Sequence, residues 1–227
     1  MSRIFCVGDI HGCSATLDTL LTNEICLNKS DKIIFLGDYI DRGPDSKTVL
    51  DIILDLDAKN YDVTCLMGNH EEMFIESHQD DEIYEHWVLK CGGNVTLSSF
   101  NILTYEDLSE SYKYFFNTLL HFKTLNNKYI MVHAGINFSY ANIFEDRNTM
   151  LWGRNTNINH DILKDRKIIH GHTPQSFEKT SQQLQMISED KIINIDTGCV
   201  FCNSNGLGRL TALELNSMQL YSAINIE

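Results

Sequence analysis

A stretch near the beginning of the chain decides the fold, and it reads IIFLGDYIDRG at residues 33–43. Four apolar residues are followed at once by Gly37 and Asp38. A short apolar run that ends in turn residues predicts a buried strand, and a glycine lets the backbone turn sharply at its end. The stretch therefore predicts a strand that delivers a carboxylate to the loop after it.

The same arrangement occurs at four other places in the chain. Apolar runs at 4–7, 63–67, 130–132 and 168–169 lead into GDIHG, GNHE, HAG and HGH. In an open α/β sheet, ligands bind outside the carboxyl ends of the strands. We therefore expect five loops with polar side chains to converge on one rim of the molecule.

The elements between these loops predict an α/β fold. Helical patterns at 14–25 and 44–57 separate the predicted strands at 4–7, 32–36 and 63–67. This β-α-β-α-β order implies parallel strands joined by right-handed crossovers.

The rest of the chain changes character twice. Residues 71–120 lack strand signals and are expected to form a helical cap. Beyond them, short apolar runs separated by Asn, Gly and Asp favour antiparallel or mixed pairing, with strands expected at 129–132, 167–169, 191–195, 210–215 and 219–224. Because no composition break marks a boundary, we expect residues 1–227 to form one domain in which both halves share a core.

Composition narrows the class of protein. The chain carries 18 Lys and Arg against 31 Asp and Glu, a formal net charge of -13, which argues against a nucleic-acid partner because such binding needs a basic face. No apolar run approaches the roughly 20 residues of a membrane helix, and the first residues do not resemble a signal peptide. We therefore expect a cytoplasmic protein without a membrane partner. Cys199 and Cys202 are expected to be buried, reduced thiols.

Six side chains in the predicted loops have the chemistry of metal ligands: Asp9, His11, Asp38, Asn69, His133 and His172. Three imidazoles and three oxygen donors are too many for one four-coordinate ion. They suit two first-row divalent ions that share a bridging carboxylate, and mixed nitrogen and oxygen ligation favours Mn, Fe or Zn over Ca. Two such ions can clamp a phosphoryl group and activate a water between them.

Three further residues add groups that metal binding does not require. His70, next to Asn69, could protonate a leaving oxygen as a general acid, and Asp41 could fix the tautomer of its ring. Arg42 could bind phosphate oxygens through its planar fork. The alternative is that Asp41 and Arg42 form an ordinary surface pair.

Together these segments resemble the metal-dependent phosphoprotein phosphatases, in particular the bacterial and phage branch whose prototype is the phosphatase of bacteriophage lambda. The resemblance continues in LWGR at 151–154, GHTP at 171–174 and IDTG at 195–198, and spans about residues 4–202. It implies the calcineurin-like metallophosphoesterase fold, in which two packed mixed β-sheets are flanked by helices.

The resemblance also implies a role for each residue. Asp9, His11 and Asp38 would hold a first ion, Asp38, Asn69, His133 and His172 a second, His70 with Asp41 would be the acid, and Arg42 and Arg154 would grip the phosphate. Manganese is the expected metal, with iron or zinc as alternatives. Hydrolysis would proceed by direct attack of hydroxide, without a phosphoenzyme.

Three functions follow from this pattern. The first is a serine/threonine protein phosphatase, whose substrate would be a phosphorylated protein or a small phosphoester. The second is a dinucleoside polyphosphate hydrolase or a broad-specificity phosphoesterase of the same fold; the DRG at 41–43 and the short chain argue against the dinucleoside polyphosphate hydrolase. The third is a metal-binding regulatory module without catalysis, which would lack a ligand or the pair of Asp41 and His70. The sequence leaves the physiological substrate, the native metal and the oligomeric state open.

Overall fold

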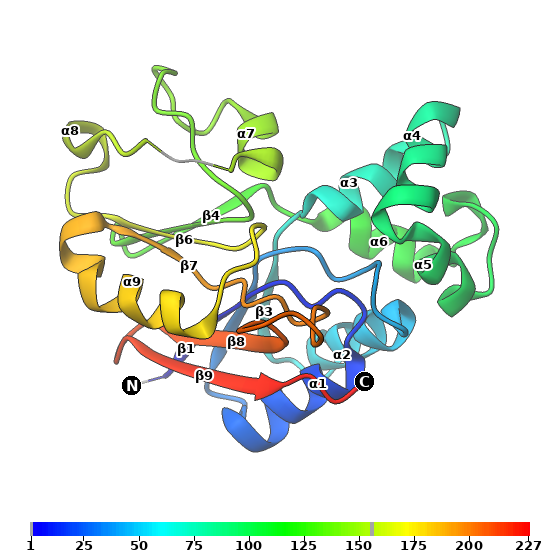
Figure 1. Ribbon diagram of the computed structural model, residues 1–227, viewed down its shortest axis with the longest axis horizontal. Coiled ribbons are helices and arrows are strands. Elements are labelled where there is room, and N and C mark those ends of the chain that lie inside the picture. Colours follow the sequence, from blue (N-terminus) through cyan, green and yellow to red (C-terminus); the bar gives the residue numbers. More distant parts are fainter. Residues whose placement is uncertain (1, 155–156) are drawn as a thin grey trace.

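The computed structural model describes residues 2–154 and 157–227, and it contains two mixed β-sheets with helices around them (Figure 1). The first sheet has the strand order β3 (Asp62–Cys65), β2 (Lys32–Phe35), β1 (Ile4–Val7), β8 (Arg209–Glu214) and β9 (Gln219–Ile224). Strands β1, β2 and β3 are parallel, whereas β8 and β9 run antiparallel. The parallel arrangement predicted for the first third of the chain is therefore confirmed.

The second sheet has the order β4 (Phe122–Leu125), β5 (Tyr129–Val132), β6 (Lys167–His170) and β7 (Ile192–Asn194). Only β4 is antiparallel to its neighbour, and β5, β6 and β7 are parallel. Strand β4 was not predicted, because Lys123 and Thr124 interrupt its apolar pattern; it is an edge strand with mostly half-buried residues.

The two sheets bury their shared faces against each other. Cys6 and Ile34 of the first sheet belong to the same hydrophobic cluster as Met131, Ile169 and Ile193 of the second. Successive residues of a strand point to opposite faces, so the alternate residues of β1 face away from the second sheet and pack with the helices. Burial on both faces explains why these strands appear in the sequence as continuous apolar runs.

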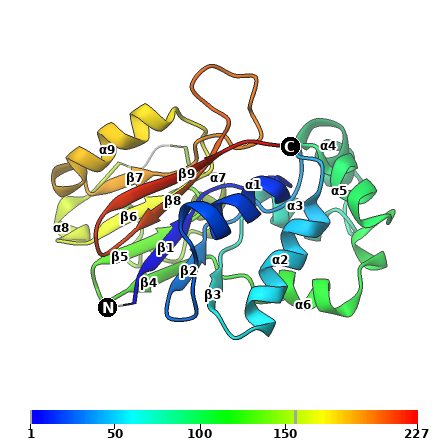
Figure 2. The same cartoon turned by 90° about the horizontal axis from the view of Figure 1, so that it is seen from below.

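Helices cover the outer faces of the sheets (Figure 2). Helix α1 (Ser14–Thr19) continues as a π-helical turn η1 (Leu20–Glu24), and α2 (Ser46–Ala58) begins after Asp45, whose side chain accepts a hydrogen bond from the Thr48 amide. Helix α9 (Phe177–Asp190) packs on β7. The short helices α7 (Arg147–Trp152) and α8 (His160–Leu163) lie in the connection from β5 to β6.

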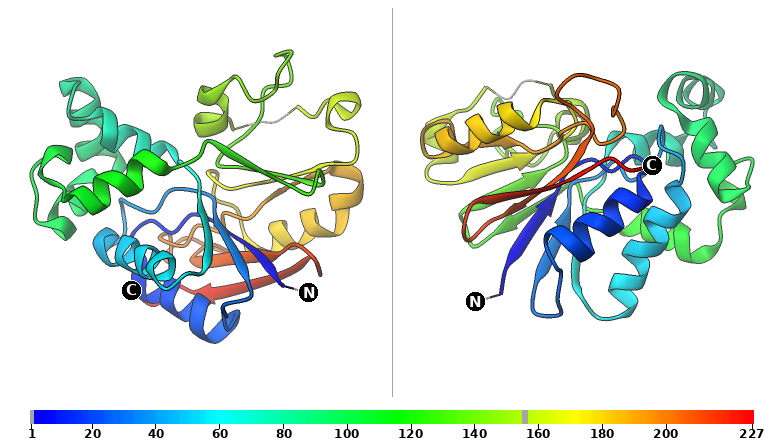
Figure 3. Two further views of the ribbon diagram at one scale, coloured as in Figure 1. Left: turned by 180° about the vertical axis from the view of Figure 1, so that it is seen from behind. Right: turned by 60° about the horizontal axis from the view of Figure 1, so that its bottom comes forward.

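The segment between β3 and β4 consists of helices joined by short loops and stands to one side of the sheets (Figure 3, left), as the cap prediction required. It contains α3 (Asn69–Glu76), α4 (Asp81–His86), η2 (Trp87–Cys91), α5 (Gly93–Phe100), η3 (Tyr105–Asp107) and α6 (Glu110–Thr118). Trp87 stacks on Phe74 with ring centroids 4.8 Å apart. We call residues 69–118 the cap.

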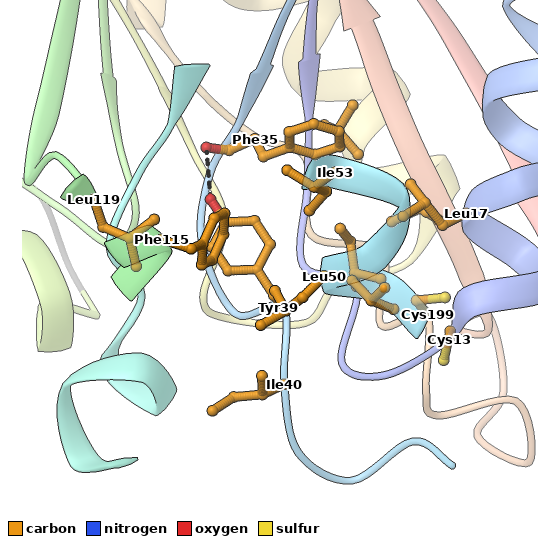
Figure 4. Packing of buried hydrophobic residues seen from close by; sticks show 14 of the residues in the cluster. Cys13, Leu17, Phe35, Tyr39, Ile40, Leu50, Ile53, Phe115, Leu119 and Cys199 are labelled. Carbon is orange, nitrogen blue, oxygen red and sulfur yellow. Dashed lines mark hydrogen bonds between the residues drawn. The ribbon is translucent and has the colours of Figure 1, made fainter. Parts of the chain in front are cut away.

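The cap shares its hydrophobic cluster with the first sheet. Figure 4 shows Tyr39, from the loop after β2, between Phe35 and the cap residue Phe115. The Tyr39 hydroxyl donates to the Leu66 carbonyl oxygen at 2.8 Å. The base of the cap is thereby fixed to the loop that carries Asp38.

The cysteine prediction is correct for one thiol and wrong for the other. Cys199 is buried, and Cys202 is exposed; both are free thiols. The C-x-x-C segment lies in the loop between β7 and β8 rather than in a strand. Cys202 begins the part of this loop, residues 202–206, that is exposed. In the described part of the chain, no helix is long and apolar enough to cross a membrane.

Candidate active site

Asp38 lies at the centre of the predicted metal ligands. Its Oδ2 is 3.5 Å from His11 Nε2, and its Oδ1 is 3.4 Å from His133 Nε2. Asn69 Oδ1 is 3.0 Å from both His133 Nε2 and His172 Nδ1. Asp38 follows the end of β2 in a left-handed conformation, with φ = +53°. The loops thus converge as the sequence predicts.

Backbone carbonyl groups orient two of the imidazoles. His11 Nδ1 lies 2.9 Å from the Ile40 carbonyl oxygen, and His133 Nδ1 lies 2.9 Å from that of Leu36. A proton on Nδ1 leaves Nε2 as the acceptor that faces Asp38. Burial lowers the pKa of both rings, so both are neutral near pH 7, which is the form that binds metal.

Asp9 occupies the edge of this group. Two sets of three donors lie within 4.8 Å of one another in the described chain, His11 with Asp38 and His70, and Asp38 with His133 and His172, and Asp9 belongs to neither. Its carboxylate instead accepts the backbone N–H of His172 at 3.0 and 3.2 Å. Burial and the neighbouring Asp196 raise the pKa of Asp9.

The residues present fit two divalent ions. Two side-chain atoms in the site, His172 Nε2 and Asp196 Oδ2, are buried and lack a hydrogen-bond partner. Burial opposes ionisation of Asp38, but at low pH the positive charge on the protonated rings of His133, His70 and His11 outweighs it and lowers the pKa of Asp38, which is therefore ionised at neutral pH. Neutral imidazoles around an ionised carboxylate are the donors that first-row metals prefer.

His70 and Asp41 form a buried pair next to this group. His70 Nδ1 is 2.6 Å from Asp41 Oδ2, and its Nε2 points toward Asp38, 3.9 Å from Oδ2. Both side chains are almost fully buried. The surface-pair alternative is therefore wrong for Asp41, because this carboxylate faces the interior.

Two cap residues donate hydrogen bonds to the Asp41 carboxylate, and neither contact was predicted from the sequence. Trp87 Nε1 donates to Asp41 Oδ2 at 2.6 Å, and Thr96 Oγ1 donates to Oδ1 at 2.6 Å. Gly92 and Gly93 allow this close approach. A Cβ atom on Gly92 would lie 2.7 Å from the Arg42 backbone nitrogen, and one on Gly93 would lie 2.3 Å from the Trp87 ring.

The two predicted phosphate ligands are the exposed residues of the site. Arg42 is exposed and has φ = +69°. Its Nη1 lies 2.5 Å from His11 Nε2, and its Cζ lies 5.6 Å from the centroid of the Phe201 ring. Arg154 is also exposed. Burial and His133 lower the pKa of His172 to about 3, and the charge of Arg154 acts in the same direction.

A groove of about 500 Å³ lies between the cap and α7. Its lining includes Glu72, Glu76, Asp80, Glu82, His86 and Trp152. The Trp152 ring is 38% exposed, lies edge-on to His172 with centroids 6.4 Å apart, and donates its N–H to Glu72. The groove is thus strongly acidic, and Trp152 is the lining residue that contacts the site.

This fold and site define a metallophosphoesterase. The family model described as calcineurin-like phosphoesterase matches residues 2–199, and the chain belongs to that family. An asymmetrical bis(5'-nucleosyl)-tetraphosphatase, PrpE of Oceanobacillus iheyensis, is 30% identical, with 88% of this chain and 86% of the relative covered.

Solved structures show the same fold. A structure assigned as a diadenosine tetraphosphatase matches with TM-score 0.63 and 19% identity over 100% of this chain and 95% of the other. A serine/threonine phosphatase of Saccharomyces cerevisiae matches with TM-score 0.65 and 17% identity over 100% and 81%. The predicted family is confirmed at this level, but the curated relatives carry the tetraphosphatase name rather than that of the phage phosphatase branch.

Proposed function

We propose that this metallophosphoesterase hydrolyses dinucleoside tetraphosphates. The convergence of His11, Asn69, His133 and His172 around Asp38 supports phosphoryl chemistry. The choice of substrate rests on the tetraphosphatase relatives, which align over most of the chain. It reverses the order of the first two functions that the sequence suggested.

Asp38 is proposed to bridge the two ions. Asp9 and His11 would complete the first position, and Asn69, His133 and His172 would complete the second, with manganese as the proposed metal and iron or zinc as alternatives. Two bound ions would neutralise phosphate oxygens and lower the pKa of the attacking water. The other residues must then bind the substrate and deliver a proton.

Arg42 and Arg154 are proposed to bind the phosphate. Both are exposed, and a guanidinium can reach two oxygens of one phosphate. His70 Nε2 faces the site while Asp41 holds Nδ1, so the ring can donate a proton to the departing oxygen.

The protein phosphatase function remains the second candidate, because of two observations. An alkoxide that leaves from phosphoserine needs a proton far more than a nucleotide phosphate does, and the site holds a buried acid pair in His70 and Asp41. The acidic groove also favours a leaving group with positive charge over a polyphosphate chain.

Hydrolysis with Mn should be measured side by side on diadenosine tetraphosphate, a phosphoserine/phosphothreonine peptide and a phosphotyrosine peptide. We expect the highest kcat/KM on the dinucleotide. A higher value on either peptide would replace the proposed substrate by the second candidate. The third alternative, a non-catalytic module, is opposed by the enzyme family and by the presence of both Asp41 and His70.

A further inference from the structure

Asp196 repeats the strand-then-carboxylate pattern on a sixth loop. It follows β7, which pairs with β6, and the end of β6 leads directly to Gly171 and His172. The sequence IINIDTG at 192–198 therefore delivers a carboxylate to the same rim as the five motif loops. This residue is not among the six predicted ligands.

The Asp196 side chain is buried, and only one of its two carboxylate oxygens has a hydrogen-bond partner. Its residue is 2% exposed. Oδ1 accepts the Gly198 backbone N–H at 2.8 Å, whereas Oδ2 is buried and has no hydrogen-bond partner. A buried carboxylate oxygen without a partner is strongly unfavourable unless a cation or donor compensates it.

The neighbour of Asp196 is another carboxylate, that of Asp9. Gly171 lies against both residues, because a Cβ atom there would be 2.1 Å from Asp9 Oδ1 and 3.6 Å from Asp196 Cβ. Gly8 also lies against Asp196, because a Cβ atom there would be 3.4 Å from Asp196 Cα. Two buried carboxylates at such a place repel each other unless a positive charge lies nearby.

Support of the loop does not explain why the residue is an aspartate. The bond to the Gly198 amide uses one oxygen and needs no charge, so an asparagine would serve equally. The hydrogen bond to Gly198 therefore accounts neither for the negative charge of Asp196 nor for its second oxygen. Both suit the coordination of a divalent cation.

We infer that Asp196, through its uncompensated carboxylate beside Asp9, strengthens cation binding at the first metal position. This inference rests on the proposed dimetal centre and adds a residue to it. It makes Asp196 a positioning residue that raises affinity for the first ion and leaves the second position, around Asn69 and His133, unchanged.

The test is metal binding to Asp196→Asn, which keeps the acceptor for Gly198 and removes the charge. Mn stoichiometry is measured by elemental analysis after dialysis at a buffered free Mn that holds two equivalents on the wild type. We expect D196N to retain one equivalent, with at least a roughly tenfold loss of affinity at the other position. Unfolding midpoints are measured with and without Mn.

The thermal unfolding midpoint distinguishes a role of Asp196 in metal binding from a role in stabilising its own loop. Without metal, D196N should melt at or above the wild-type temperature, and its rise on adding Mn should shrink. The matched control is Asp31→Asn, another buried carboxylate, whose oxygens both have partners; it should melt lower and keep both equivalents. Asp196→Ser, which keeps a short acceptor, should bind Mn as D196N does and covers the case in which D196N fails to fold.

Two results would overturn the inference. One is a D196N protein that holds two equivalents with wild-type affinity, and the other is a loss of metal-free stability without a loss of metal. A wild type that binds no Mn would instead overturn the dimetal centre itself, together with this inference. Substrate preference enters none of these measurements.

Discussion

Two carboxylates of the site, Asp41 and Asp196, differ in how the chain satisfies them. Asp41 receives hydrogen bonds from Trp87 and Thr96 and contacts His70, so both of its oxygens have partners within the protein. Asp196 has a hydrogen-bond partner for Oδ1 alone, its Oδ2 is buried without one, and its charge raises the pKa of the neighbouring Asp9. The cap side is therefore complete within the chain, whereas the geometry on the Asp9 side is expected to depend on bound metal.

Asp38→Asn should have the largest effect, because Asp38 belongs to both proposed positions. Asparagine tolerates the left-handed conformation at this site, so the fold should persist. Activity should fall by more than about 100-fold, since changes to residues around metal ligands alone cost about 10–100-fold. Elemental analysis after dialysis should show loss of both ions; full retention would exclude a bridging role.

His70→Asn tests the cap side without disturbing the metal side. It should keep both ions and lower turnover of a phosphoserine peptide by about 100-fold or more. Hydrolysis of diadenosine tetraphosphate should fall less, because its leaving phosphate needs no acid. Steady-state kinetics on both substrates would test this, and unchanged peptide turnover would remove His70 from the reaction.

Trp87→Phe sharpens the comparison by removing one donor to Asp41. The ring can still stack on Phe74. Loss of this charge-assisted bond should lower the free energy of unfolding by about 1–3 kcal/mol, and turnover should fall by about 10–100-fold. Trp152→Phe is the matched control for stability, since the Trp152 N–H donates to Glu72 at the surface; an equal loss of unfolding free energy in both variants would contradict the role of Trp87.

Arg154→Ala should affect substrate binding alone. Arg154 is exposed, so its removal should leave the unfolding midpoint unchanged. Loss of one charge-assisted phosphate contact should raise KM about tenfold. If KM and kcat are both unchanged, Arg154 lies outside the substrate site.

Arg3→Ala should have the smallest effect and serves as a remote reference for both sides. Asp31 is held by the Arg3 guanidinium, and although burial opposes it, this contact lowers the pKa of Asp31. The pair therefore contributes stability above about pH 4, where Asp31 is ionised in the unfolded chain, and loses it as the pH falls through the lower folded value. Denaturation should show a deficit of about 1 kcal/mol or less at pH 7, which disappears as the pH falls through the lowered folded pKa of Asp31; turnover at pH 7 should not change.

The sequence could predict those features that depend on residues close together in the chain. Apolar runs that end at Gly37 or Gly68 gave the strands and the order of the loops, and the structure brings the loops together. Strand β4 was missed because an edge strand owes its pairing to its neighbour β5. The contacts of Trp87 and Thr96 with Asp41 join residues 46 and 55 positions apart, so no local pattern marks them.

The ends of the cap lie side by side. The Met67 amide donates to the Leu120 carbonyl, and the Leu120 amide donates to that of Cys65. A segment that leaves and returns at one place can be exchanged between related enzymes as a unit, with little change to the sheets. Trp87, Thr96, Gly92 and Gly93 belong to this segment. Such a chimera would therefore exchange the residues that hold Asp41 and His70 in place together with the lining of the groove. New substrate preference and altered proton donation would therefore be inherited together.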